Sequence, residues 1–209
     1  MKERPILFSA PMVRALLAGT KTQTRRVLKP QPPDTTHQVS TWHHPDPRPQ
    51  FFAWTDNGEG GAELADDGWC KPCPYGQPGD RLWVREAWKA HTTFDHLPPR
   101  DIPHSHVWYM ADDGYKAESR YRQGMFMPRW ASRITLEITA VRVEKLQDIS
   151  ADDARAEGCP DKPFDGAEQA SVDLLAKLWY HDLWESINGA GSFGANPWVW
   201  VVEFKRVMP

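Results

Sequence analysis

A lysine and a threonine stand three positions apart near the start of the chain, at Lys21 and Thr24. A lysine beside a threonine hydroxyl is a base and an alcohol of the kind used for acyl transfer, provided that burial lowers the pKa of the lysine. Most Lys-x-x-Thr pairs are solvated surface residues. The spacing therefore favours catalysis only if the rest of the chain places both side chains in a protected site.

The residues around this pair predict a helix, a turn and then a strand. An apolar run over 15–18 ends at Gly19, which suits the left-handed position that follows a helix. A strand over 20–27 sends alternate side chains to opposite faces. Lys21, Gln23 and Arg25 then share one face, and Thr22, Thr24 and Arg26 share the other.

Length and composition describe one globular domain. The chain has 209 residues, of which 40% are hydrophobic and 25% charged. Its net charge of −3 argues against a polyanion binder as a whole, although residues 1–30 carry seven basic side chains against Glu3 alone. No apolar stretch is long enough to span a bilayer and no secretory signal opens the sequence. We therefore expect a cytoplasmic protein without a membrane partner.

Three cysteines, Cys70, Cys73 and Cys159, are too few for a disulfide framework, and the odd count fits a reducing compartment. Cys70 and Cys73 have metal-ligand spacing, but a zinc site needs a second pair of ligands. The nearest histidines, which form no paired motif, are His43, His44, His91 and His96. Two free cysteines beside a turn are the favoured interpretation, and no metal is expected.

Elsewhere strand-like and helix-like segments follow one another. We expect strands over 6–8, 79–88, 107–110, 133–146 and 197–206, with a bulge after Ala140 where the apolar alternation changes phase. Helices are expected over 11–18, 150–157 and 168–187, the second starting at Ser150 and ending at Gly158. Residues 30–78 show little periodicity, which is typical of a lid, a binding loop or partial disorder. This order predicts an α+β fold with a mixed sheet or small barrel and helices at its ends.

Four segments spread along the chain carry a family pattern. They are the turn and strand over 19–26, the strand start at 79–80, the segment 146–158, and the terminal Val-Val-Glu-Phe-Lys that ends at Lys205. Together they resemble the ASCH domain family of small PUA-like β-barrels, and the patterns over 79–86 and 196–200 resemble its longer, phage-associated branch. The resemblance implies a single PUA-like mixed β-barrel over 1–209, with flanking helices and insertions at about 30–78 and 89–128.

Within that family the motifs are similar to those of the bacterial N4-acetylcytidine amidohydrolases. The similarity implies an enzyme that removes an acyl group from an N4-acylated cytosine nucleoside or base, without a cofactor. It implies Lys21, Thr24 and Glu157 as the catalytic residues. Asp152 and Asp153 are rivals to Glu157, and we interpret them as first-turn residues that stabilise the helix dipole.

Three residues, Arg26, Arg85 and Glu86, are expected to bind the substrate in the same cleft. Arg26 falls on an arginine that recurs in the family. Arg85 and Glu86 are neighbours on a strand, so at most one of them faces the cleft. We favour Glu86, because a carboxylate can accept a hydrogen bond from a cytosine-type amino group.

Two alternatives stay open. Hydrolysis can proceed through an acyl group on Thr24, or through water activated by Lys21 and Glu157 while Thr24 hydrogen-bonds the acyl oxygen. The chain can instead be a non-catalytic PUA-like module whose partner is RNA or a modified base, with aromatic side chains for stacking. In that case the expected phosphate contacts are Arg25, Arg26, Arg129 and Arg133.

Overall fold

The computed structural model describes residues 1–42, 49–65, 68–112, 118–160 and 169–207. Within these ranges it has strands in three sheets and three α-helices, which confirms the α+β class. The helices are α1 (Ala10–Ala18), α2 (Ala151–Ala156) and α3 (Gln169–Asn188). The short 3-10 helices are η1 (Thr92–Phe94), η2 (Pro99–Asp101), η3 (Gly124–Phe126), η4 (Arg129–Ala131) and η5 (Leu146–Asp148).

The central sheet combines segments from both ends of the chain. Its strands are β1 (Glu3–Leu7), β2 (Gln23–Val27), β7 (Arg81–Arg85), β10 (Thr135–Lys145) and β11 (Trp198–Val207), in the spatial order β1-β7-β10-β11-β2. β1 pairs with β7 in parallel, and the other neighbours are antiparallel. The β10–β11 register shifts between Ile138 and Ala140, which confirms a bulge in this part of the strand.

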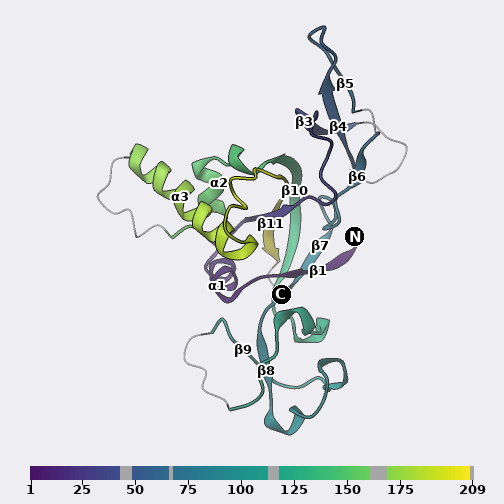
Figure 1. Cartoon of the computed structure of the whole chain (residues 1–209). Helices are drawn as coiled ribbons and strands as arrows, with labels where there is room; N and C mark the ends of the chain where they lie inside the picture. The colour runs from purple at the N-terminus through teal and green to yellow at the C-terminus, as the bar shows by residue number, and fades with distance from the viewer. Residues whose placement is uncertain (43–48, 66–67, 113–117, 161–168, 208–209) are drawn as a thin grey trace.

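The burial of β11 explains why its sequence is a continuous apolar run. Trp198, Trp200, Val202 and Phe204 belong to one hydrophobic core, and Val199 and Val201 to a second. Residues of α1 pack into the first core, and residues of α2 and α3 into the second. Since both faces of the strand are covered, no polar alternation is needed. Figure 1 shows α2 and α3 next to each other beside the central strands, with α1 apart from them.

Four strands between Gln38 and Pro72 form a small antiparallel sheet, so the expectation of an irregular insertion is wrong for these strands. Its strands are β3 (Gln38–Trp42), β4 (Gln50–Asp56), β5 (Ala62–Leu64) and β6 (Cys70–Pro72), with β4 in the middle. Phe51 packs edge-on against Trp200 at 4.9 Å between ring centroids, which ties this sheet to the first core. β4 carries Phe51, Phe52 and Trp54 in close succession, so aromatic side chains lie on both of its faces. The alternation of apolar and polar residues that normally indicates a strand is therefore absent from its sequence.

The described residues of 88–131 form a second added unit with a core of its own, called the 88–131 unit below. β8 (Trp88–Ala90) pairs with β9 (Val107–Tyr109), and η1 to η4 lie in the same part of the chain. The core of this unit consists of Trp88, Ala90, Ile102, Val107, Met127 and Ala131. Figure 1 shows the two added units at opposite ends of the central sheet. Among the helices of the described residues, none is long and apolar enough to cross a membrane.

Candidate active site

Backbone pairing brings Lys21 and Glu157 together. After α1 ends at Gly19, Lys21 forms an isolated antiparallel bridge with Glu157. The backbone NH of Thr22 donates to the carbonyl of Ala156 at 2.8 Å, which extends this contact by one residue. The end of α2 is therefore joined to the residues that lead into β2, and the two predicted catalytic side chains start from adjacent backbone positions.

Gly158 makes this approach possible. Its φ of 100° lies in the left-handed region, which residues with a Cβ rarely adopt. A Cβ at this position would lie 3.0 Å from Cβ of Ala15 and 3.5 Å from Cβ of Lys21. A larger residue here is expected to push α2 away from the end of α1 and to separate Lys21 from Glu157.

The Lys21 ammonium group is buried against the Glu157 carboxylate. Nζ donates to Oε2 at 2.7 Å and to the Glu157 backbone carbonyl at 2.9 Å. The two side chains are 0% and 3% exposed. Burial lowers the pKa of Lys21, the charges of Arg26 and Arg25 lower it further, and the opposing effect of Glu157 does not restore the ordinary value. Lys21 is thus easier to deprotonate than a surface lysine.

Arg25 holds the other side of the Glu157 carboxylate. Its Nη1 lies 3.4 Å from Oε1 of Glu157, and its Nη2 lies 3.2 Å from Oδ2 of Asp153. Arg25 also pairs with Glu144, and its guanidinium lies 5.8 Å from the ring centre of Tyr180. With one cation on each carboxylate oxygen, Glu157 is fixed in position.

Asp153 joins this network, which corrects its assignment as a helix-dipole residue alone. It forms a capping box with Ser150 at the start of α2, and Oδ1 accepts from Nε2 of Gln23 at 3.0 Å and from Nη2 of Arg142 at 2.9 Å. Burial alone would raise the pKa of Asp153, but the hydrogen bonds from Ser150 and Gln23 and the charge of Arg25 lower it to about 2. Asp153 is therefore ionised, and it helps to hold Gln23, Arg25 and Arg142 in position.

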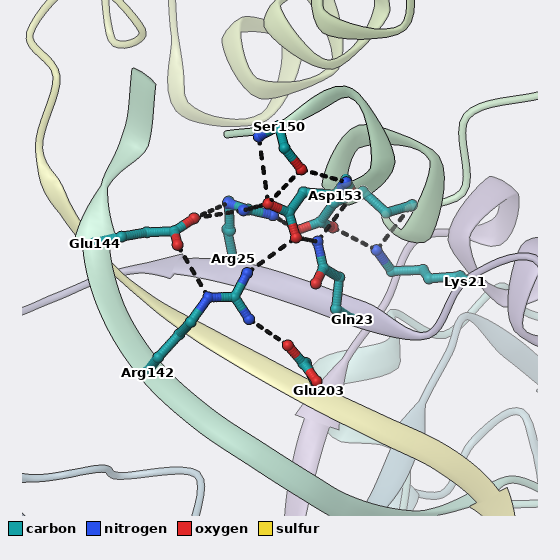
Figure 2. Close-up of polar contacts among 9 residues, drawn as sticks. Lys21, Gln23, Arg25, Arg142, Glu144, Ser150, Asp153 and Glu203 are labelled. Atoms are coloured by element: carbon teal, nitrogen blue, oxygen red, sulfur yellow. Dashed lines mark hydrogen bonds and ion pairs between the residues drawn. The ribbon is translucent and has the colours of Figure 1, made fainter. Parts of the chain in front are cut away.

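Arg142, on strand β10 of the central sheet, is the next member of this network. Figure 2 shows it between Glu144, Asp153 and Glu203, with which it forms ion pairs. The rival acid Asp152 is different, since its side chain is 94% exposed and pairs with Arg155 on the surface.

A small cavity of about 50 Å³ lies beside the edge strand β2. Thr24, Arg26 and Glu157 line it, and α3 contributes Tyr180, Leu183, Trp184, Ile187 and Asn188. Arg25 and Val27 also line it, so side chains from both faces of the edge strand β2 reach this space. A volume of this size holds a few water molecules. The structure thus brings Thr24 to the same cavity as Glu157, with Lys21 behind the carboxylate.

Of the three predicted binding residues, the structure places only one at the cavity. Arg26 lines the cavity, and its Nη2 donates to the Leu7 carbonyl at 2.7 Å. Glu86 does not line it: its buried carboxylate accepts two hydrogen bonds from Arg133, at 2.9 and 3.0 Å, and burial raises its pKa despite that pairing. Arg85 lies over the Trp83 ring at 4.6 Å and donates to the Met125 carbonyl. Arg133 also pairs with Asp112 and lies 3.8 Å from the centre of the Tyr109 ring, so the Glu86–Arg133 pair connects the 88–131 unit to the central sheet.

The cysteines have no described metal partners. Within the described ranges, no group of three or more His, Cys, Asp or Glu side chains is placed to hold a metal ion. Burial raises the pKa of Cys73 to about 11, so its thiol stays protonated at neutral pH. His43 and His44 lie outside the described residues.

Sequence reasoning missed Gln23, Glu144 and Tyr180 as parts of the site. A signal existed for Gln23, since alternation along the strand places it on the face of Lys21 and Arg25. Glu144 stands next to the apolar Val143 on β10, where a charged side chain indicates a specific partner. Tyr180 has no such signal, because a buried aromatic on an amphipathic helix is usually core.

The chain matches no known protein family model, no curated protein and no solved structure. The resemblance to the ASCH family therefore remains a prediction from the motifs.

Proposed function

We propose that this protein is a metal-independent amidohydrolase that removes an acyl group from an N4-acylated cytosine nucleoside or base. One observation carries the proposal: a buried lysine with a lowered pKa donates at 2.7 Å to a carboxylate that lines a cavity with Thr24. A base, an acid and a hydroxyl in one protected place are what amide hydrolysis requires. We also propose that the central sheet belongs to a PUA-like barrel.

In the first route, water is the nucleophile. The pair of Lys21 and Glu157 takes a proton as the water oxygen bonds to the acyl carbon, while the Thr24 hydroxyl donates to the developing oxyanion. The C–N bond then breaks, the proton passes to the departing N4 nitrogen, and a carboxylic acid and the cytosine amine are released. This route uses the Lys21–Glu157 pair as it stands.

In the second route, Thr24 is the nucleophile. Neutral Lys21 accepts the proton of the Thr24 hydroxyl, whose oxygen bonds to the acyl carbon, and the amine leaves after protonation of N4. Water then hydrolyses the acyl-threonine ester. In the structure both Lys21 hydrogen bonds go to Glu157, so this route requires Lys21 to turn toward Thr24 first.

The size of the cavity bears on substrate entry. About 50 Å³ is far below the roughly 300 Å³ at which small-molecule pockets begin. Leu183, Trp184 and Ile187 of α3 form part of its wall. We therefore propose that α3 moves away from β2 when the substrate binds.

The alternative, a non-catalytic RNA-binding module, has three of its four expected phosphate contacts already paired with carboxylates. Arg25 pairs with carboxylates of the site network, Arg129 pairs with Glu3, and Arg133 pairs with Glu86 and Asp112. Incubation of the pure protein with N4-acetylcytidine, followed by measurement of cytidine and acetate, tests the hydrolase proposal directly. Binding of RNA without release of acetate would instead favour the module.

A further inference from the structure

Four large apolar side chains are exposed where the 88–131 unit meets the end of β1. Leu7, Tyr121, Met125 and Phe126 have exposed fractions of 48%, 54%, 52% and 59%. We call these four residues the aromatic surface. Tyr121 and Phe126 also line an open cavity of about 520 Å³, together with His96, Arg120 and other residues. A cavity of this volume is in the range that takes a small organic group such as a nucleobase with its sugar.

Direct contacts connect this surface to the candidate active site. Arg26, which lines the active-site cavity, donates to the Leu7 carbonyl at 2.7 Å. Leu7 in turn touches η3, since a Cβ built on Gly124 would lie only 2.8 Å from Leu7 Cδ1. Phe126 ends η3. Leu7 therefore lies in contact with both Arg26 and the short helix that carries Phe126.

Three arginines contact residues of the aromatic surface or line its cavity. Arg26, Arg85 and Arg120 donate to the backbone carbonyls of Leu7, Met125 and Asp95, and within the described part of the chain none of them forms an ion pair. Neighbouring arginines differ, since Arg122 pairs with Asp95 and Arg129 with Glu3. Cations without a carboxylate partner beside exposed aromatic rings are complementary to a ligand that carries both phosphates and flat bases.

We propose that the aromatic surface and these three arginines bind single-stranded RNA. Unpaired bases stack on Tyr121 and Phe126, and the backbone phosphates contact the arginines. A duplex does not fit this chemistry, because its bases are already stacked on one another. The further claim that the strand carries the acylated cytosine to the cavity, and that the substrate is RNA and not a free nucleoside, rests on the proposed function.

Fluorescence anisotropy with a labelled short single-stranded RNA tests the binding. Tyr121→Ala and Phe126→Ala should each weaken binding by about 5- to 100-fold, the usual effect of removing one stacking side chain. Arg120→Gln should make the salt dependence of log Kd shallower by about one phosphate contact. Leu178→Ala, which removes a 50% exposed leucine from α3, is the matched control and should bind as the wild type does.

Unchanged RNA affinity in Tyr121→Ala and Phe126→Ala would overturn the proposal. So would equal affinity for double-stranded RNA, or tighter binding of single-stranded DNA of the same sequence. Phe126→Ala should hydrolyse free N4-acetylcytidine at the wild-type rate but an RNA that contains it more slowly. If the protein hydrolyses the nucleoside without binding RNA, only the surface proposal fails. If it binds RNA through this surface without hydrolysis, only the proposed function fails.

Discussion

Lys21 and Glu157 are 136 positions apart in the chain, yet they form a backbone bridge and a buried ion pair with 2.7 Å between Nζ and Oε2. The bridge depends on main-chain atoms and is independent of either side chain. A substitution of one side chain therefore leaves the other close to its present position, although the remaining charge is then buried without its partner. Kinetic measurements on such variants need a parallel check of folding.

Glu157→Ala should lower kcat for N4-acetylcytidine by about 10²- to 10⁴-fold, because the group that orients the lysine and carries the proton is lost. The double variant, with both Glu157→Ala and Lys21→Ala, should have a kcat close to that of Glu157→Ala alone, since the two residues act as one unit. The matched control is the surface pair of Lys205 and Glu137, which are 2.8 Å apart and 64% and 30% exposed, and whose removal should leave kcat unchanged. Multiplicative effects of the two site substitutions would argue against a joint role.

Thr24 separates the two routes of hydrolysis. Thr24→Ser keeps a hydroxyl and should retain turnover in either route. Thr24→Val keeps the shape but removes the hydroxyl, so it should abolish turnover if an acyl-threonine forms. If Thr24 only donates to the oxyanion, the loss should be about 10²- to 10³-fold. Trapping of an acylated protein by mass spectrometry in the wild type, and its absence in Thr24→Val, is the measurement that decides.

The pH dependence of the reaction should follow Lys21. Burial, with the charges of Arg26 and Arg25, holds the pKa of Lys21 below 10.5, so kcat/KM should rise with pH and level off below that value. Glu157 raises the pKa of Lys21, so Glu157→Gln should move the rising limb to lower pH. Arg26 lowers it, so Arg26→Gln should move the limb to higher pH. If kcat/KM rises over the same pH range in both variants as in the wild type, Lys21 is not the base.

The sequence predicted the elements around the site well, because each carries a local signal. Gly19 ends α1 as expected, the phase change near Ala140 marks the bulge in β10, and Ser150 begins α2. The pairing of Lys21 with Glu157 followed from the family resemblance and not from any local pattern. The β10–β11 pair was predictable as two apolar strands, but its register comes from the packed structure.

The rest of the site depends on long-range contacts that local patterns do not encode. Under the RNA-binding alternative Arg25 was expected to contact phosphate. Because Arg25 is buried, its charge needs a carboxylate partner, and three acidic groups surround it, from β10, from α2 and from the residue that follows α2. Glu86 was expected to bind substrate, but Arg133 occupies its carboxylate. In both cases the sequence shows a charged residue on a strand, and only the fold determines which opposite charge lies across from it.

Asp153 should make stability depend on pH on the acid side. Its pKa is about 2 in the folded protein against an ordinary value of 3.8, so its ionised form stabilises the fold above pH 3.8. This stabilisation is lost as pH falls through about 2, where the folded protein must also bind the proton. Asp153→Asn should therefore lower the free energy of unfolding in urea most above pH 3.8, and less as the pH falls. Asp152→Asn, on the same helix but 94% exposed, should show little difference at any pH.

The most direct test of the account is the turnover of N4-acetylcytidine by the wild type and by Lys21→Ala, measured side by side at saturating substrate with both products quantified. The wild type should release cytidine and acetate in equal amounts, without an added metal. Lys21→Ala, checked to be folded by circular dichroism, should be slower by about 10²- to 10⁴-fold. Equal turnover by the two proteins, or no turnover of any N4-acylated cytosine by the wild type, would contradict it.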